Sequence, residues 1–363
     1  METNRIRLAI TQGDTNGVGY EVVLKAFADP TLFELCTPVL YGNPRIAAYH
    51  AKSCGLSTPF STIHSIDQAR PDRLNLLVCD DEEVPVTLGQ ESPQAGAQAL
   101  KALEAAVLDC KLGRADALVT APINKHAIQS DAFRFPGHTE YIQASVGDGE
   151  EALMILLNPS IRVALVTTHL PIAQVSKAIT SENILGKLHV FNRSLQRDFA
   201  CERPRIAVLA LNPHAGEGGL LGQEEQSIIA PAIEEAQKEG IHAFGPYPAD
   251  GFFGTRAYEH YDGVLAMYHD QGLAPFKSLA MDDGVNFTAG LSLVRTSPDH
   301  GTAYNIAGKD LANENSFRQA LYTAIDVFRN RTRYDEAHDT PLEKLYNERR
   351  EDERKPRRSP ERA

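Results

Sequence analysis

Three histidines in this 363-residue sequence occur in the same local setting. His169, His214 and His269 each follow a short apolar run of the kind that forms a buried strand, in RVALVTTH, RIAVLALNPH and GVLAMYHD. Ligands of open α/β sheets bind beyond the carboxyl ends of the strands. Three imidazoles gathered there, with a fourth position open, suit a divalent metal that acts as a Lewis acid. A single histidine of this kind is more often a hydrogen-bonded loop residue, so the metal hypothesis depends on the repetition.

A second group of residues has the chemistry to bind an anion. Lys and Arg side chains near loop amides clamp phosphate or carboxylate groups. Taken singly, each such residue is typical of a solvated surface, and only their convergence would make a site. The group consists of Lys125 in TAPINK, His138 and Thr139 in FPGHTE, Lys277 after HDQGLAPF, Asn286 and Arg295.

Short apolar runs alternate along the chain with helical segments, and these elements must position the two groups. The runs are Ile6–Thr11, Val39–Gly42, Leu74–Cys79, Ala117–Thr120, Val163–Thr168, Ile206–Leu211 and Gly263–Tyr268. Segments Ser92–Leu112 and Gln223–Glu239 have helical composition. Continuous apolar strands that alternate with helices predict an α/β fold with a mainly parallel sheet.

Composition narrows the class of protein. Hydrophobic residues make up 42% and charged residues 23%, which is typical of a soluble globular chain. No apolar run approaches the roughly 18 residues of a membrane span. A net charge of -12 disfavours nucleic acid as a partner. Five cysteines without a CxxC motif predict buried thiols in a reducing, cytoplasmic setting. Residues 347–363 carry dense mixed charge and predict a disordered tail.

Seven sequence blocks between roughly residues 5 and 330 occur in an order that resembles one known family. The blocks are TAPINK, GHTEY, TTHLPIAQV, NPHAGEGGLLGQEE, GPYPAD, AMYHDQGLAPFK and RTSPDHGTAYNIAGK. Together they resemble the 4-hydroxythreonine-4-phosphate dehydrogenase (PdxA) family. The resemblance implies two α/β/α lobes like those of isocitrate and isopropylmalate dehydrogenases, with the active site in the cleft between them. We expect a first lobe of residues 1–137 plus 262–335, a second lobe of residues 138–261, and a homodimer.

The same resemblance assigns roles to individual residues. It implies that His169, His214 and His269 hold one divalent metal, with the third histidine coming from the partner subunit; zinc, cobalt and magnesium all remain open. It implies substrate binding by His138, Thr139, Lys277, Asn286 and Arg295. It implies an adenosine-binding loop at residues 300–309, with contacts from His300, Gly301, Thr302, Ala303, Asn305 and Asn313.

Cofactor choice is an expectation from that loop. Asn305 stands where related dehydrogenases have an acidic residue that binds the ribose hydroxyls and repels a 2′-phosphate. No Lys or Arg lies between His300 and Gly308 to pair with that phosphate. We therefore expect NAD as the cofactor, with NADP possible.

The implied reaction is the NAD-dependent oxidation of 4-phosphohydroxy-L-threonine at its 3-hydroxyl. The β-keto acid then decarboxylates to 3-amino-2-oxopropyl phosphate, a precursor of pyridoxal 5′-phosphate. The base is Lys125 or a metal-bound hydroxide, and Asp250 or Asp270 orients a metal histidine. Three alternatives stay open: a dehydrogenase of 4-phosphorylated D-threonate or D-erythronate, a phosphate acyltransferase, and a metabolite-binding protein without activity.

Overall fold

A computed structural model describes residues 5–131, 133–147 and 151–339 of the chain. The predicted tail at 347–363 lies outside the described residues. The strands are β1 (Ile6–Thr11), β2 (Cys36–Gly42), β3 (Phe60–Ile63), β4 (Leu74–Val78), β5 (Ala117–Thr120), β6 (Leu153–Leu157), β7 (Arg162–Leu165), β8 (Arg205–Leu209), β9 (His242–Tyr247), β10 (Gly263–Ala266), β11 (Val285–Ala289) and β12 (Arg295–Pro298). The α-helices are α1 (Gly19–Ala26), α2 (Leu32–Leu35), α3 (Pro44–Ser53), α4 (Pro93–Lys111), α5 (His138–Val146), α6 (Ile172–Ala178), α7 (Ser181–Arg197), α8 (Ala230–Lys238), α9 (Ala249–Gly254), α10 (His269–Leu279) and α11 (Asn315–Asp339).

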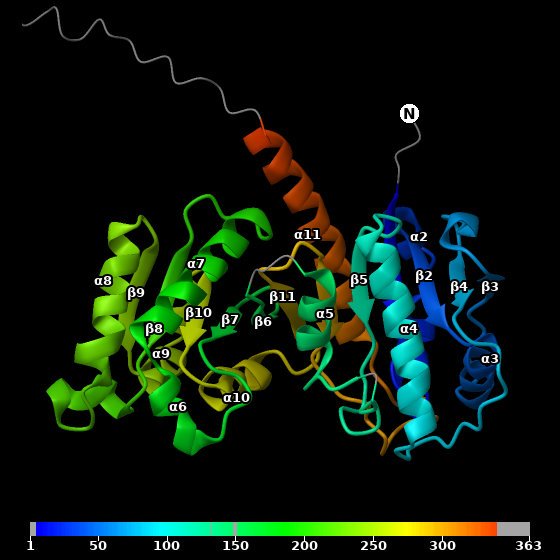
Figure 1. Cartoon of the computed structure of the whole chain (residues 1–363), viewed down its shortest axis with the longest axis horizontal. Helices are drawn as coiled ribbons and strands as arrows, with labels where there is room; N and C mark the ends of the chain where they lie inside the picture. Colours follow the sequence, from blue (N-terminus) through cyan, green and yellow to red (C-terminus); the bar gives the residue numbers. More distant parts are fainter. Residues whose placement is uncertain (1–4, 132, 148–150, 340–363) are drawn as a thin grey trace, which may run out of the picture.

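All of these strands join in one sheet, in the order β3-β4-β2-β1-β5-β12-β11-β6-β7-β10-β8-β9. Figure 1 shows the sheet running along the long axis of the molecule, with β3 and β4 at one end and β8 and β9 at the other. The pairs β11–β12, β6–β11 and β6–β7 are antiparallel, and the other pairs are parallel. The expected mainly parallel α/β fold is confirmed, and the antiparallel strands join its two halves into a continuous sheet.

Helices cover both faces of the sheet because buried side chains alternate along its strands. On β1, Leu8 and Ile10 belong to a core shared with α1 and α11, whereas Ala9 belongs to a core shared with α4. This is the period-two alternation of a strand buried on both faces. Helix α11 contacts β5, β11 and β12, and it therefore crosses the middle of the molecule (Figure 1).

Helix α4 agrees with its predicted range, and its sequence explains both the start and the buried face. The Ser92 side chain accepts a hydrogen bond from the Ala95 amide, and Pro93 occupies the first turn, where its missing N–H costs nothing. Small and aliphatic residues, among them Ala99 and Leu103, then face the sheet. The predicted helix 223–239 is instead divided into a π-helical turn at Glu225–Ile229 followed by α8.

The pairing of β10 bears on the expected division into lobes. Strand β10 lies between β7 and β8, which belong to the expected second lobe, although residue 262 was expected to return the chain to the first. Strand β12 pairs in parallel with β5 of the first half. The division into a first lobe of residues 1–137 plus 262–335 and a second lobe of residues 138–261 stays a prediction.

Within the described residues, no helix combines the length and the apolar character that crossing a membrane requires. All five cysteines are free thiols; Cys36 and Cys54 are buried and the other three are half-buried.

Candidate active site

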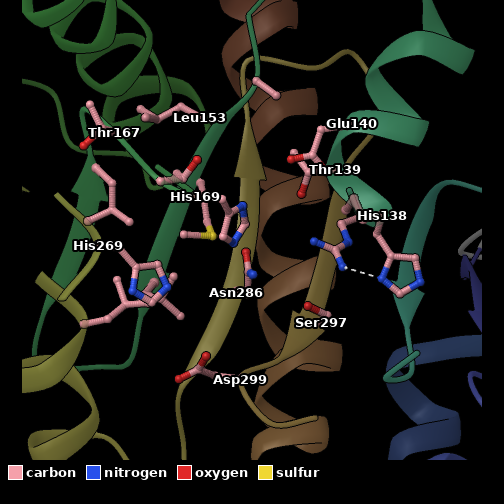
Figure 2. Close-up of a pocket in the computed structure, with 18 of the residues that line it drawn as sticks. His138, Thr139, Glu140, Leu153, Thr167, His169, His269, Asn286, Ser297 and Asp299 are labelled. Carbon is pink, nitrogen blue, oxygen red and sulfur yellow. Dashed lines mark hydrogen bonds between the residues drawn. The ribbon is translucent and has the colours of Figure 1, made fainter. Parts of the chain in front are cut away.

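A cavity of about 730 Å³ lies at the middle of the sheet, beyond the carboxyl ends of β5, β7, β10 and β12. Figure 2 shows His169 and His269 on one side of it, His138 on the other, and Asn286 between them. The predicted residues that line it are Lys125, His138, Thr139, His169, His269, Lys277, Asn286, Arg295, His300 and Gly301. The sheet therefore brings ten of the predicted residues to one place, although they come from segments far apart in the sequence.

Arg295, the first residue of β12, is the most deeply buried cation of this cavity. Its side chain is 3% exposed. The guanidinium donates to Thr120 Oγ1 at 2.7 Å and to Thr288 Oγ1 at 3.3 Å. Burial lowers its pKa to about 10, so it remains charged at neutral pH. Among the described residues no carboxylate forms an ion pair with it, although the charge of Glu140 acts on it from within the cavity. A buried guanidinium without a directly paired carboxylate indicates a place where a ligand can supply an anion.

His138 begins α5 and adds a neutral donor next to this charge. Its Nδ1 accepts from Arg295 Nη2 at 3.3 Å, which places the ring proton on Nε2 (dashed line in Figure 2). Burial, followed by the charges of Arg295 and Lys125, lowers the pKa of His138 well below 6.5. The buried Nε2 atom has no hydrogen-bond partner among the described residues. His138 is therefore an uncharged donor prepared for a ligand.

Lys277, on α10, forms an ion pair that the sequence did not predict. Its Nζ lies 3.1 Å from Asp299 Oδ2 and also donates to the Asp299 carbonyl oxygen at 3.1 Å. Burial raises the pKa of Asp299, while Lys277 counteracts this. Asp299 lines the cavity beside His300. The only signal in the sequence was its place before the histidine of the predicted cofactor loop.

The predicted metal histidines are divided between two cavities. The rings of His169 and His269 lie 5.9 Å apart between centroids. His214 lines a separate cavity of about 550 Å³ together with Asp250. Within the described residues, no three His, Cys, Asp or Glu side chains gather closely enough to hold a metal ion. One chain thus brings two of the three predicted ligands together.

The two imidazoles that do meet have the donor chemistry of metal ligands. Burial is the largest cause of the lowered pKa of His169, which favours the neutral ring that a metal needs. His269 Nδ1 lies 2.7 Å from Asp270 Oδ1, so Nε2 is the ring nitrogen that would bind a metal. Asp270 is thus placed beside His269, and Asp250 lies in the cavity of His214. The two candidate orienting residues are each near a different histidine.

The predicted cofactor loop packs over the turn that follows β1. The Thr302 carbonyl oxygen accepts from the Val18 amide at 3.0 Å, and Tyr304 donates to Asp14 at 2.8 Å. Two of its predicted residues, His300 and Gly301, line the central cavity, whereas Thr302, Ala303, Asn305 and Asn313 do not. Lys309, just beyond the range considered in the sequence, donates to the Asn305 carbonyl oxygen at 2.8 Å. The expectation from the sequence covered only residues between His300 and Gly308, and the structure adds the Lys309 ammonium group beside Asn305.

Three buried polar atoms of the central cavity lack a partner among the described residues. They are His138 Nε2, Asn286 Oδ1 and His300 Nε2. A buried polar atom without a hydrogen bond is costly, so such atoms mark places where a ligand binds. Together with Arg295 and Lys125 they describe a site for a polar, anionic molecule.

Comparison with known proteins identifies the family of this chain. The profile of the family described as "Pyridoxal phosphate biosynthetic protein PdxA" matches residues 34–324. A 4-hydroxythreonine-4-phosphate dehydrogenase of Bacteroides thetaiotaomicron is 58% identical over 352 residues, which cover 97% of each chain. One from Prosthecochloris aestuarii is 41% identical, covering 89% of this chain and 97% of its own.

A solved structure with the same enzyme name also superposes on this chain. The crystal structure of a 4-hydroxythreonine-4-phosphate dehydrogenase from Klebsiella pneumoniae superposes with a TM-score of 0.77 at 33% identity, covering 90% of this chain and 98% of that one. The profile match spans most of the chain, and relatives well above 30% identity cover nearly all of it. This chain belongs to the PdxA family of pyridoxal phosphate biosynthetic proteins.

Proposed function

We propose that this chain oxidises 4-phosphohydroxy-L-threonine at the 3-hydroxyl with NAD, and that the β-keto acid decarboxylates to 3-amino-2-oxopropyl phosphate on the route to pyridoxal 5′-phosphate. The observation that carries the proposal is the buried Arg295 guanidinium, which has only neutral hydrogen-bond partners among the described residues. A phosphorylated substrate supplies the missing negative charge. The names of the relatives supply the substrate class.

The polar end of the cavity would hold the substrate's anionic groups. Arg295 donates from a rigid planar fork, His138 donates from Nε2, and Thr139 lies beside them at the start of α5. Lys277 would exchange one of its contacts with Asp299 for a substrate oxygen. Asn286, from the antiparallel strand β11, offers an unpartnered carbonyl oxygen to a donor on the substrate.

NAD would be held by the loop that begins at His300. The unpartnered His300 Nε2 and the adjacent Gly301 line the cavity, which fits a cofactor that reaches the substrate from this side. When bound, NAD would supply the hydride acceptor for the oxidation. The remaining loop residues would lie along the adenosine end, outside the cavity.

A divalent metal would be held by His169 and His269 together with His214 of a second copy of the chain. When bound, it lowers the pKa of the substrate hydroxyl as a Lewis acid. The Asp299 carboxylate, which is paired with Lys277, would accept the hydroxyl proton, and Lys125, which also lines the cavity, would do so only as the neutral amine. The rings of His169 and His269 contact each other, whereas His214 of the same chain lines a different cavity. The proposal therefore needs a second copy of the chain to supply the third histidine.

The test is NADH formation by purified protein with 4-phosphohydroxy-L-threonine, and with 4-phospho-D-threonate and 4-phospho-D-erythronate as competing candidates. We expect the amino acid to be turned over with much the higher kcat/KM, activity to fall after treatment with a chelator, and activity to return on adding a divalent metal. A preference for either phosphorylated sugar acid would overturn the substrate assignment. Full activity in metal-free buffer would overturn the metal assignment.

A further inference from the structure

The chain around His214 has an unusual backbone conformation. His214, Ala215, Gly216, Glu217 and Gly218 all have positive φ, at 54°, 53°, 77°, 45° and 65°. Gly219 continues the run with a φ of 101°. Single left-handed residues are common in turns, but a run of six positive φ values that includes three non-glycine residues is one that L-amino acids avoid. Such a backbone persists only where its surroundings determine it, and it is found mainly at functional sites. The turn at 214–218 is therefore held in place by something outside it.

The buried carboxylate of Glu225 provides that hold. Its side chain is 3% exposed, and Oε1 accepts from the amides of Leu211 and Asn212 at 2.9 and 2.7 Å. The Asn212 side chain donates to Glu225 Oε2 at 3.1 Å and to Glu224 Oε2 at 2.8 Å. No cation pairs with Glu225 in the part of the chain that the structure describes. The Glu225 carboxylate therefore holds the backbone of Leu211 and Asn212, which leads into the turn.

Close packing joins the turn to this carboxylate. A Cβ atom at Gly216 would lie 2.6 Å from Glu225 Oε2 and 2.9 Å from the Gly222 carbonyl oxygen. A Cβ atom at Gly218, which has a similar φ, would meet nothing within 4 Å. Glu225 opens the π-helical turn Glu225–Ile229 ahead of α8, and π-helical turns are frequent at functional sites. Asn212, Gly216 and Glu225 thus form one contact set, which we name the 212–225 clamp.

His214 does not line the central cavity of its own chain. The His214 side chain is exposed and lines the separate cavity that contains Asp250. Leu220 and Leu221, which follow the turn, are 80% and 44% exposed. An exposed imidazole on a rigid turn, next to exposed apolar side chains, is suited to reach a site on another molecule.

We propose that the 212–225 clamp is a positioning device that holds the His214 imidazole in the orientation required to complete the metal site of a second copy of the chain. This inference rests on the proposed function, in which His214 is the third metal ligand. Groups that orient metal ligands change metal affinity without touching the metal, by about 10- to 100-fold.

The experiment measures Co²⁺ binding to the metal-stripped full-length protein, by visible absorption, together with its thermal unfolding in the absence of metal. Glu225→Gln keeps the shape of the side chain but makes two donors face each other, because the new amide meets either Asn212 Nδ2 or the two backbone amides. Gly216→Ala pushes a methyl group into Glu225. Gly218→Ala is the matched control, because it carries a similar left-handed penalty without that contact. His214→Ala is the reference for loss of the ligand.

We expect His214→Ala, Glu225→Gln and Gly216→Ala to weaken Co²⁺ binding, the last two by about 10- to 100-fold. Saturating Co²⁺ should restore the spectrum of Glu225→Gln but not that of His214→Ala. Gly218→Ala should bind like the wild type. If His214→Ala loses binding while Glu225→Gln and Gly216→Ala bind no worse than Gly218→Ala, the clamp proposal is wrong and the role of His214 stands. If His214→Ala binds Co²⁺ normally, the proposed metal site itself is wrong, and the clamp proposal is wrong with it.

Discussion

The Arg295 guanidinium and the His138 imidazole form the polar end of the cavity as a unit. The arginine is charged and hydrogen-bonded to hydroxyl groups, and burial, followed by the charge of the arginine, lowers the pKa of the histidine so that it stays neutral. The two residues are 157 positions apart in the sequence, yet they share a hydrogen bond of 3.3 Å. An anion that enters this end therefore meets one fixed charge and one neutral donor, which favours a bound phosphate or carboxylate.

The shape of the Arg295 side chain matters as much as its charge. In Arg295→Lys the ammonium group cannot donate to Thr120, Thr288 and an anion along one planar fork. We expect the KM for the phosphorylated substrate to rise by about 10-fold or more, which corresponds to about 1.4 kcal/mol of lost binding. Steady-state kinetics measure this, with Arg134→Lys on the surface as the control. An unchanged KM would remove Arg295 from the binding site.

The lowered pKa of His138 predicts a pH dependence of stability. Below its ordinary pKa of 6.5, the unfolded chain binds a proton at this residue that the folded protein refuses. The contribution of His138 to the free energy of unfolding is therefore complete above pH 6.5 and decreases as the pH falls below it, by up to about 1.4 kcal/mol per pH unit.

Denaturant unfolding at a series of pH values tests this contribution. We expect His138→Asn to have a smaller loss of stability than the wild type on acidification from about pH 7 to pH 5. The matched control is His64→Asn, at an exposed position. Equal slopes for the wild type and His138→Asn would contradict the buried, neutral state of this ring.

Cofactor choice depends on the neighbours of Asn305. Asn305→Asp would place a carboxylate where a 2′-phosphate would bind, and Lys309→Gln would remove the ammonium group that lies on the Asn305 carbonyl oxygen. Each change should raise the NAD-to-NADP ratio of kcat/KM by about 5-fold, or about 1 kcal/mol. If both variants keep the wild-type ratio, the loop at 300–309 does not bind the adenosine end.

At the scale of elements, helix α4 positions the loop that carries Lys125. Gly96 lies on its buried face, where a Cβ atom would approach the Ala127 carbonyl oxygen to 2.0 Å. The helix can come this close to the loop only because residue 96 has no side chain. The position of the Lys125 ammonium group therefore depends on a contact between backbones.

Two helical glycines make a matched test of that contact. Gly186 lies inside α7, and a Cβ atom there would meet nothing within 4 Å. Gly186→Ala should raise the free energy of unfolding by about 0.5–1 kcal/mol, because alanine is the better helix former. Gly96→Ala should lower it by about 1–3 kcal/mol and also reduce kcat/KM, since the loop must move. A stabilised and fully active Gly96→Ala protein would contradict this role of α4.

At the scale of the whole molecule, the division of the histidines predicts which subunits can complement each other. His169 and His269 face each other within one chain, and His214 does not join them. If His214 acts on a second copy, a mixed dimer of His169→Ala and His214→Ala subunits contains one intact site. Refolding the two inactive proteins together at equal concentrations should restore about a quarter of the wild-type activity.

The control for this experiment is a mixture of His169→Ala and His269→Ala. Both of these residues contribute to the same cavity of the same chain, so every site in the mixed dimer lacks one ligand. We expect no recovery from that mixture. Recovery there would show that His169 and His269 serve sites of different chains. No recovery from the first mixture would place His214 in the same chain's site as His169.

The strands that the sequence predicted are those buried on both faces by continuous apolar runs, such as β1 and β5. It did not predict β3, β6, β9, β11 or β12. Strand β12, with the sequence RTSP, carries no apolar run, and its place in the sheet comes from pairing with β5 and β11. Local periodicity cannot reveal such a strand because its partners supply its stability.

What the sequence determined by itself was the α/β class, the helix α4 and ten of the residues that line the central cavity, because strand, helix and motif patterns are local. Only the tertiary structure decided how those residues pair. It buried Arg295 without a carboxylate partner, joined Lys277 to Asp299, and separated His214 from His169 and His269. Burial and ion pairing depend on atoms contributed by distant segments, so their effect on charge and reactivity appears only when the sheet brings those segments together.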